Sequence, residues 1–126
     1  MRAKRIPLFV LLFLFAACLC SNVRMGILCR GWEKELAAAQ RAAETADYPG
    51  AAAALGRLYT DWERRQVYLH IIVPHDEVDQ AQELIDLCRL ALQRQDEDAF
   101  LTAAVRLRSQ LDLLREIEQL SIKNVL

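Results

Sequence analysis

Apolar side chains recur at helical spacing along most of the chain. Between residues 51 and 73 the larger apolar positions follow one another mainly at steps of three, four and seven residues. An α-helix turns once every 3.6 residues, so these steps bring the side chains onto one face. We therefore predict an amphipathic helix over 51–73. The positions concerned are Leu55, Leu58, Tyr59, Trp62, Leu69 and Ile72.

Three other segments have the same pattern, and they predict helices over 32–46, 76–93 and 98–118. Proline, glycine and acidic residues at 47–50 and 95–98 predict the turns between the helices. No segment alternates as a strand does, so we predict an all-α fold. The expected inward positions are Leu36, Ala39 and Ala43, then Val78, Ala81, Ile85, Cys88 and Leu92, then Phe100, Ala103, Leu107, Leu111 and Leu114.

Pro74 divides the helical part of the chain into two halves. Proline lacks a backbone N–H and disfavours helical conformation in the residue before it, so Val73 should end one helix. We expect His75 or Asp76 at the N-cap of the next helix. Acidic side chains such as Glu77 are favoured in that first turn, where they meet the positive end of the helix dipole.

The two halves resemble each other at a shift of 49 residues. The spacing predicts two tandem antiparallel helical hairpins, packed either as a four-helix bundle or in a tetratricopeptide-like arrangement, after an N-terminal hydrophobic helix. The matching pairs are Asp47 and Asp96, Ala54 and Ala103, Arg57 and Arg106, Leu58 and Leu107, and Trp62 and Leu111.

The N-terminus has the composition of a membrane segment. Three basic residues, at positions 2, 4 and 5, precede an uncharged apolar run over 6–20. Fifteen helical residues reach about 22 Å and eighteen, counted to Val23, about 27 Å, against about 30 Å for a hydrocarbon core. We therefore assign residues 1–31 to an anchor or signal segment with its tether, and 32–126 to a helical domain of two hairpins.

Three fates of this segment remain open. We favour a retained single-pass anchor, because a cut after Ala17 would put bulky Phe15 where a signal peptidase needs a small residue. Cleavage and release is the second. The third is lipidation at Cys18, since residues 14–18 resemble a lipoprotein box. In each case the basic cluster stays inside, which puts the helical domain on the far side of the membrane. For the favoured anchor we expect it at the cell membrane, on the extracytoplasmic side.

Charge excludes one class of partner. The first 31 residues hold five basic and no acidic side chains, whereas the chain as a whole has a net charge of -1. The helical part is therefore acidic, and it lacks the basic face that nucleic-acid binding needs. We expect no nucleic-acid partner.

One acidic stripe is the candidate contact surface. Asp76, Asp79, Glu83 and Asp86 are spaced to share one face of the third expected helix, and His75 stands four residues before Asp79. This surface could meet a basic partner, hold a cation or simply be solvated. It has no calcium-loop pattern, so we predict no metal ligands and no cofactor.

Nothing in the sequence predicts catalysis. His70 and His75 are five residues apart across a proline, so we do not expect them on one helical face, and no nucleophile stands beside either. We expect no enzymatic activity. Cys29 is predicted on a flexible tether and Cys88 in the core, and neither has the spacing of a zinc site.

Short motifs resemble a known family. They are Asp-Trp-Glu at 61–63, His75 with Glu-Val-Asp at 77–79, the ending over 118–126, and Ser-Asn at 21–22 after the hydrophobic run. Together they resemble the bacterial family catalogued as domain of unknown function 4363. The resemblance implies a short, membrane-tethered helical protein, serving a neighbouring multi-spanning membrane protein, and it carries no catalytic residues.

The sequence thus favours a membrane-tethered extracytoplasmic helical module for protein interaction or scaffolding. The alternative is an exported, lipoprotein-like binding protein. It would use the acidic helix face, with His75, Asp76, Asp79 and Glu83, for a cation or a basic ligand.

Overall fold

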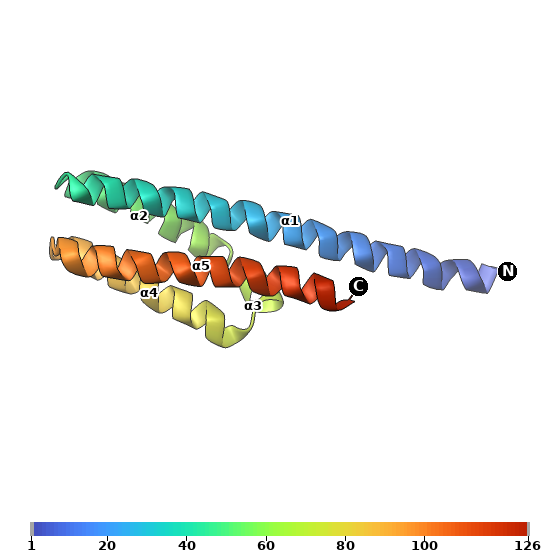
Figure 1. Ribbon diagram of the computed structural model, residues 1–126. Coiled ribbons are helices and arrows are strands. Elements are labelled where there is room, and N and C mark those ends of the chain that lie inside the picture. The colour runs from blue at the N-terminus through green and yellow to red at the C-terminus, as the bar shows by residue number, and fades with distance from the viewer. Residues whose placement is uncertain (1, 126) are drawn as a thin grey trace.

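The computed structural model describes residues 2–125, without the side chains of 2–4, 18, 21, 22 and 121–125. Within that range the chain is helical apart from short turns, which confirms the all-α prediction (Figure 1). The helices are α1 (Arg2–Glu44), α2 (Tyr48–Arg64), α3 (Gln66–Ile72), α4 (His75–Gln93) and α5 (Glu97–Val125).

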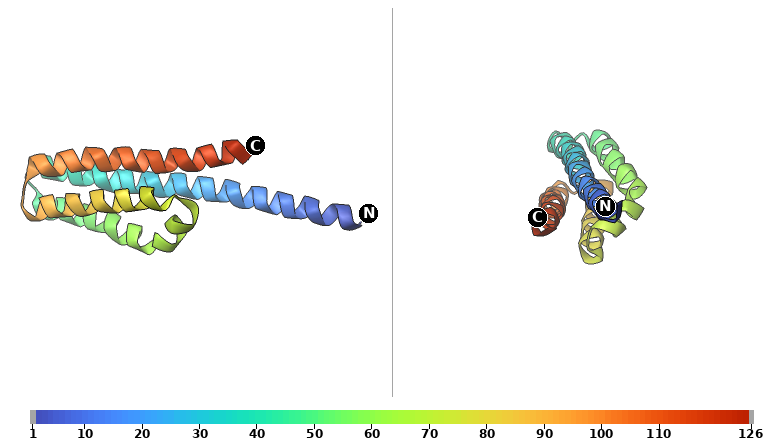
Figure 2. Two further views of the ribbon diagram at one scale, coloured as in Figure 1. Left: turned by 90° about the horizontal axis from the view of Figure 1, so that it is seen from below. Right: turned by 90° about the vertical axis from the view of Figure 1, so that its right-hand side faces the viewer.

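The four long helices form an up-and-down bundle. Helix α1 packs along both α2 and α5, and α4 packs along α5. Seen end-on, the helices follow one another around the bundle in the order α1, α2, α4, α5 (Figure 2). The short α3 crosses between α2 and α4 at the end from which α1 projects toward the N-terminus (Figure 1).

Most residues predicted to face inward do so. All the expected inward positions of the 32–46, 76–93 and 98–118 segments are buried, as are Leu55, Leu58, Trp62 and Leu69 of the remaining segment. Tyr59 and Ile72 are only half-buried. Helical periodicity therefore identified the core faces correctly.

The expected helix start at Trp32 is wrong, and so is the tether before it. Helix α1 runs without interruption from Arg2 to Glu44. Met25 and Cys29 are fully buried, and they continue the spacing of Trp32 and Leu36 toward the N-terminus. Because these side chains pack in the bundle, the helix is held together across the segment that we expected to be flexible.

The helix expected over 51–73 is divided at Arg65. Its backbone has φ −99° and ψ 8°, and its N–H is shared between the carbonyl oxygens of Asp61 and Trp62 at 3.2 and 3.1 Å. Neither proline nor glycine marks this position. The break redirects the chain across the end of the bundle and places Leu69 of α3 in the core.

The N-cap of α4 also differs from the expectation. Pro74 occupies it, without a side-chain hydrogen bond, and His75 is the first residue of the helix. Asp76 and Glu77 lie in the first turn, as predicted. The proline therefore both ends the preceding segment and begins the next helix.

Two turns 49 residues apart have the same capping hydrogen bonds. The Asp47 carboxylate accepts the N–H of Gly50 at 3.0 Å, and the Asp96 carboxylate accepts that of Ala99 at 3.1 Å. In each case the aspartate satisfies one of the free N–H groups of the first helical turn.

The residue before each aspartate has a left-handed backbone conformation. Ala46 has φ 59° and Gln95 has φ 52°. The N–H of the next residue then reaches back to the carbonyl oxygen of Ala42 in one turn, at 2.8 Å, and of Ala91 in the other, at 2.9 Å. This is the Schellman pattern that ends a helix within one residue.

The buried positions of α1 and α4, and those of α2 and α5, also correspond at this shift. Ten pairs of apolar residues 49 apart are buried in both members. Five pairs have one member on α1 and the other on α4, and five have one on α2 and the other on α5. They are Cys29 and Val78, Trp32 and Ala81, Leu36 and Ile85, Ala39 and Cys88, Ala43 and Leu92, Ala51 and Phe100, Ala54 and Ala103, Leu55 and Ala104, Leu58 and Leu107, and Trp62 and Leu111.

Candidate functional site

The predicted acidic stripe lies along α4. Asp76, Asp79, Glu83 and Asp86 are all exposed, and the last three line a shallow groove of about 450 Å³. Its remaining lining is Gln82, Leu87 and Leu90. Carboxylates and exposed leucines therefore border one another on this face.

The same two leucines line a neighbouring groove between α4 and α5. Leu87 and Leu90 are 40% and 42% exposed, and this second groove of about 430 Å³ continues to Arg94 and Arg106. The apolar strip thus has acids on one side and mixed charges on the other. Such a surface suits an amphipathic segment better than a small molecule.

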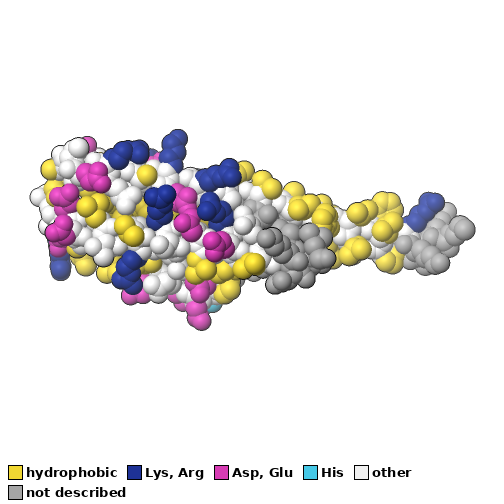
Figure 3. All heavy atoms as spheres, viewed as in Figure 1, with side chains coloured by type: hydrophobic (Ala, Val, Ile, Leu, Met, Phe, Trp, Pro, Cys, Tyr) yellow, Lys and Arg dark blue, Asp and Glu magenta, His cyan; other side chains and the backbone are white. Residues whose placement is uncertain are grey.

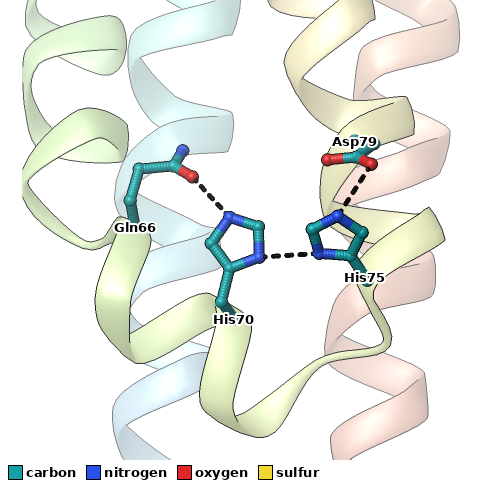
Figure 4. A network of polar contacts seen from close by, with 4 residues as sticks. All are labelled: Gln66, His70, His75 and Asp79. Atoms are coloured by element: carbon teal, nitrogen blue, oxygen red, sulfur yellow. Dashed lines mark hydrogen bonds and ion pairs between the residues drawn. The ribbon is translucent and has the colours of Figure 1, made fainter.

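His70 and His75 meet, although the sequence pattern did not predict it. The turn at Val73 and Pro74 folds α3 back against the start of α4, which brings the two Nδ1 atoms to 3.1 Å from each other (Figure 4). The ring centroids are 4.9 Å apart. His75 Nε2 also lies 3.3 Å from Asp79 Oδ2, which confirms the four-residue pairing.

A chain of hydrogen bonds joins this pair to the core. His70 Nε2 lies 3.1 Å from Gln66 Oε1, and Gln66 Nε2 donates to Gln82 Oε1 at 3.3 Å. The same Gln82 oxygen accepts the indole N–H of buried Trp62 at 2.7 Å. The histidines are therefore held by side chains that are themselves anchored in the bundle.

A second polar cluster lies between α1 and α5, and no sequence pattern predicted it. The pKa of Glu33 is raised, first by burial and then by a hydrogen bond to Asp112 and the charge of Asp112. Two carboxyl groups can share a hydrogen bond only when one of them is protonated, and Glu33 Oε1 is buried without any other hydrogen-bond donor. Arg115 donates to Asp112 at 3.1 Å.

Burial makes the thiols of Cys29 and Cys88 unreactive, because it keeps them protonated. Burial raises the pKa of the Cys29 thiol to about 12, and the Glu33 charge adds to this effect. Burial alone raises the pKa of Cys88 to about 12. Both thiols are free. Cys18, the expected lipidation position, lies outside the side chains that the structure describes.

Two features are absent among the described residues. No group of three or more histidine, cysteine or acidic side chains is placed to hold a metal ion. The side chains of residues 18, 21 and 22 are not described. Within the described residues, no helix has an apolar stretch long enough to cross a bilayer.

Comparisons with known proteins found no relative. No family model matches the chain, and neither a curated protein nor a solved structure is significantly similar to it. The resemblance to the domain of unknown function 4363 therefore stays a prediction.

Proposed function

We propose that this protein is a membrane-tethered helical interaction module, without enzymatic activity, whose bundle lies outside the cytoplasm. The observation that carries the proposal is the N-terminal part of α1. Every described side chain from 5 to 24 is exposed, and Phe9 and Phe13 are 67% and 73% exposed. The space-filling view shows these apolar side chains on a narrow projection from the bundle, with a basic side chain near its tip (Figure 3).

Exposed apolar surface of this extent is unfavourable in water. Transfer into a hydrocarbon environment gains about 25 cal/mol for each Å² removed from water. Because the same helix continues into the core at Met25, an embedded N-terminus would hold the bundle directly against the membrane. The tether would be a rigid helix and not a flexible linker.

The end of the bundle nearest the projection also presents apolar side chains. Val67 and Ile71 of α3 lie one helical turn apart, and each is 76% exposed. Arg24 of α1 lies over the ring of Tyr68, at 4.9 Å from its centroid. Aromatic and basic groups of this kind are favoured at the level of lipid headgroups.

The membrane proposal can be tested by sedimentation and carbonate extraction of native membranes. We expect the double substitution Phe9→Asp with Phe13→Asp to release the protein, since each charge costs about 3 kcal/mol inside a bilayer. The matched control is Val105→Asp with Leu120→Asp, on exposed positions of α5. Equal release of both variants, or retention of both, would contradict the anchor.

Intact mass and protease digestion from each side test the topology. A full-length mass, with the bundle digested only from outside, supports a retained anchor. A lipidated mass beginning at Cys18 would favour the exported lipoprotein. Digestion of the bundle only from the cytoplasm would contradict the proposed location.

We propose the face of α4 as the contact surface, and a basic amphipathic helix of a neighbouring membrane protein as its partner. Charge complementarity supports this choice, since Glu83 and Asp86 lie beside the exposed Leu87 and Leu90. Leucines would bury apolar surface, and the acids would orient the partner.

A helical peptide with leucines on one face and lysines beside them is the direct probe. We expect Glu83→Lys with Asp86→Lys to weaken its binding and to reduce the dependence on salt. The matched control, Glu44→Lys with Glu63→Lys, changes exposed acids away from this face and should have a smaller effect. Equal binding of a scrambled peptide of the same composition would contradict a shaped docking surface.

A further inference from the structure

We propose that His70 and His75 form a binding site for a borderline divalent transition-metal ion such as Zn²⁺, with one Nδ1 ligand from each ring. The proposal does not depend on the anchor or on the partner surface. It rests on which atom donates and which accepts in each hydrogen bond around the two rings. These directions are fixed by the groups at the ends of the network, which can only donate or only accept.

The amide orientations follow from groups that can act in only one way. Gln82 Nε2 lies 3.2 Å from Asp86 Oδ1, and a carboxylate only accepts. Gln82 Oε1 must then face the indole N–H of Trp62, which only donates. Gln66 in turn uses its Nε2 to donate to Gln82 Oε1, so its own Oε1 is the acceptor that faces His70.

Both outer ring nitrogens therefore carry a hydrogen. His70 Nε2 faces the Gln66 carbonyl oxygen at 3.1 Å, and His75 Nε2 faces the Asp79 carboxylate at 3.3 Å. A neutral imidazole has one N–H, so both Nδ1 atoms are left with lone pairs. These two lone pairs face each other at 3.1 Å (Figure 4).

A cation between the rings resolves this conflict. Two nitrogens on one zinc ion, at about 2.0–2.1 Å each and a tetrahedral angle, are about 3.3 Å apart, close to the observed separation. Metal-bound histidines also typically donate their other N–H to a carboxylate or carbonyl oxygen, which is what Asp79 and Gln66 accept here. The arrangement thus supplies the metal ligands and their supporting partners.

The surroundings favour an ion of this class. The His75 side chain is 72% exposed, so an ion can reach it, and the acidic stripe gives the site a negative environment. Imidazole nitrogens select zinc, copper and nickel over magnesium and calcium. With two protein ligands, the remaining coordination positions are open to water or to a partner's side chain.

The test uses full-length, untagged protein in detergent micelles, titrated with Zn²⁺ and observed through ¹⁵N NMR of the histidine rings. The chain has only 2 histidines, so both sets of ring signals can be assigned. Before metal is added at alkaline pH, we expect both neutral rings to carry hydrogen on Nε2. Zinc should then shift both Nδ1 signals together, saturating at one ion per chain.

Histidine and aspartate variants, together with competition by Mg²⁺, distinguish zinc binding at the two histidines from binding at the acidic stripe. His70→Ala and His75→Ala should each abolish the saturable response, and Asp79→Ala should weaken binding by about 10–100-fold. Asp76→Asn, an acidic neighbour outside the network, is the matched control and should bind as the wild type does. Mg²⁺ should not compete.

Three outcomes would overturn the proposal. In the first, zinc leaves the Nδ1 signals unchanged, which would mean that a proton alone joins the rings. In the second, only one ring responds. In the third, Mg²⁺ competes and Asp76→Asn weakens binding as much as Asp79→Ala does, which would place the ion on the carboxylates.

Discussion

Trp32 of α1 and Trp62 of α2 meet edge to face in the core, with ring centroids 5.1 Å apart and planes inclined at 66°. Each indole N–H has its own acceptor: Asp61 for Trp32 at 2.8 Å, and Gln82 for Trp62 at 2.7 Å. The pair therefore joins three helices, because Asp61 lies on α2 and Gln82 on α4. Buried tryptophans need such partners for their polar atoms.

Loss of the Trp62 donor should destabilise the bundle. We expect Trp62→Phe to lower the free energy of unfolding by about 1–3 kcal/mol, because Gln82 loses its closest donor and the smaller ring fills less space. Thermal unfolding in detergent micelles measures this. Tyr59→Phe is the control, since its ring can still lie under Arg89, and it should change stability by less than about 0.5 kcal/mol.

Glycine should increase the stability of the protein at the two turn positions that have a left-handed backbone conformation. Ala46→Gly and Gln95→Gly should each stabilise the protein by about 0.5–1 kcal/mol, because glycine adopts positive φ without steric cost. The same change at Ala53, exposed within α2, should instead cost about 0.5–1 kcal/mol. Denaturant midpoints distinguish the two signs. A loss at all three positions would show that these turns carry no strain.

Glu33 should make stability depend on pH. Its folded-state pKa lies above the ordinary value of 4.5, so its stabilising contribution is complete below that value and is lost as pH rises through the folded-state pKa. Since glutamine stays neutral, Glu33→Gln should gain stability relative to wild type as pH rises, with no gain below 4.5.

Unfolding midpoints of wild type and Glu33→Gln, measured from below pH 4.5 upward, test this prediction. Asp112→Asn should also relieve the contact between the two carboxyl groups, although it removes the negative charge that pairs with Arg115. A constant difference between Glu33→Gln and wild type at every pH would contradict the raised pKa.

The buried thiols should resist alkylation. With pKa values of about 12, Cys29 and Cys88 remain protonated at pH 8, and both side chains are fully buried. We expect iodoacetamide to modify them only after unfolding. Peptide mass spectrometry before and after denaturation checks this. Rapid native labelling of Cys29 would mean that α1 opens locally.

Local patterns were sufficient for the helix faces and for most turns. The inward positions of α4 and α5, the break at Pro74 and the contact between His75 and Asp79 all depend on residues one to four apart. Such neighbours are placed by helix geometry alone, so periodicity and capping residues were enough to predict them.

Contacts between helices could not be read in the same way. The sequence pattern separated His70 from His75 by a proline, yet the fold of α3 onto α4 brings them together. The pairing of Glu33 with Asp112 was missed for the same reason, since the two residues meet only when α1 and α5 pack. No fixed spacing encodes either approach.

The sequence by itself determined that this chain is helical, which faces are apolar, where its tight turns fall and which terminus is apolar enough to suggest a membrane. The tertiary structure decided that α1 is one helix entering the core at Met25, that the chain breaks at Arg65, and which polar groups meet. The reason is the distance along the sequence over which each effect acts. Helix geometry acts over a few residues, whereas these features depend on how separate helices pack around a shared core.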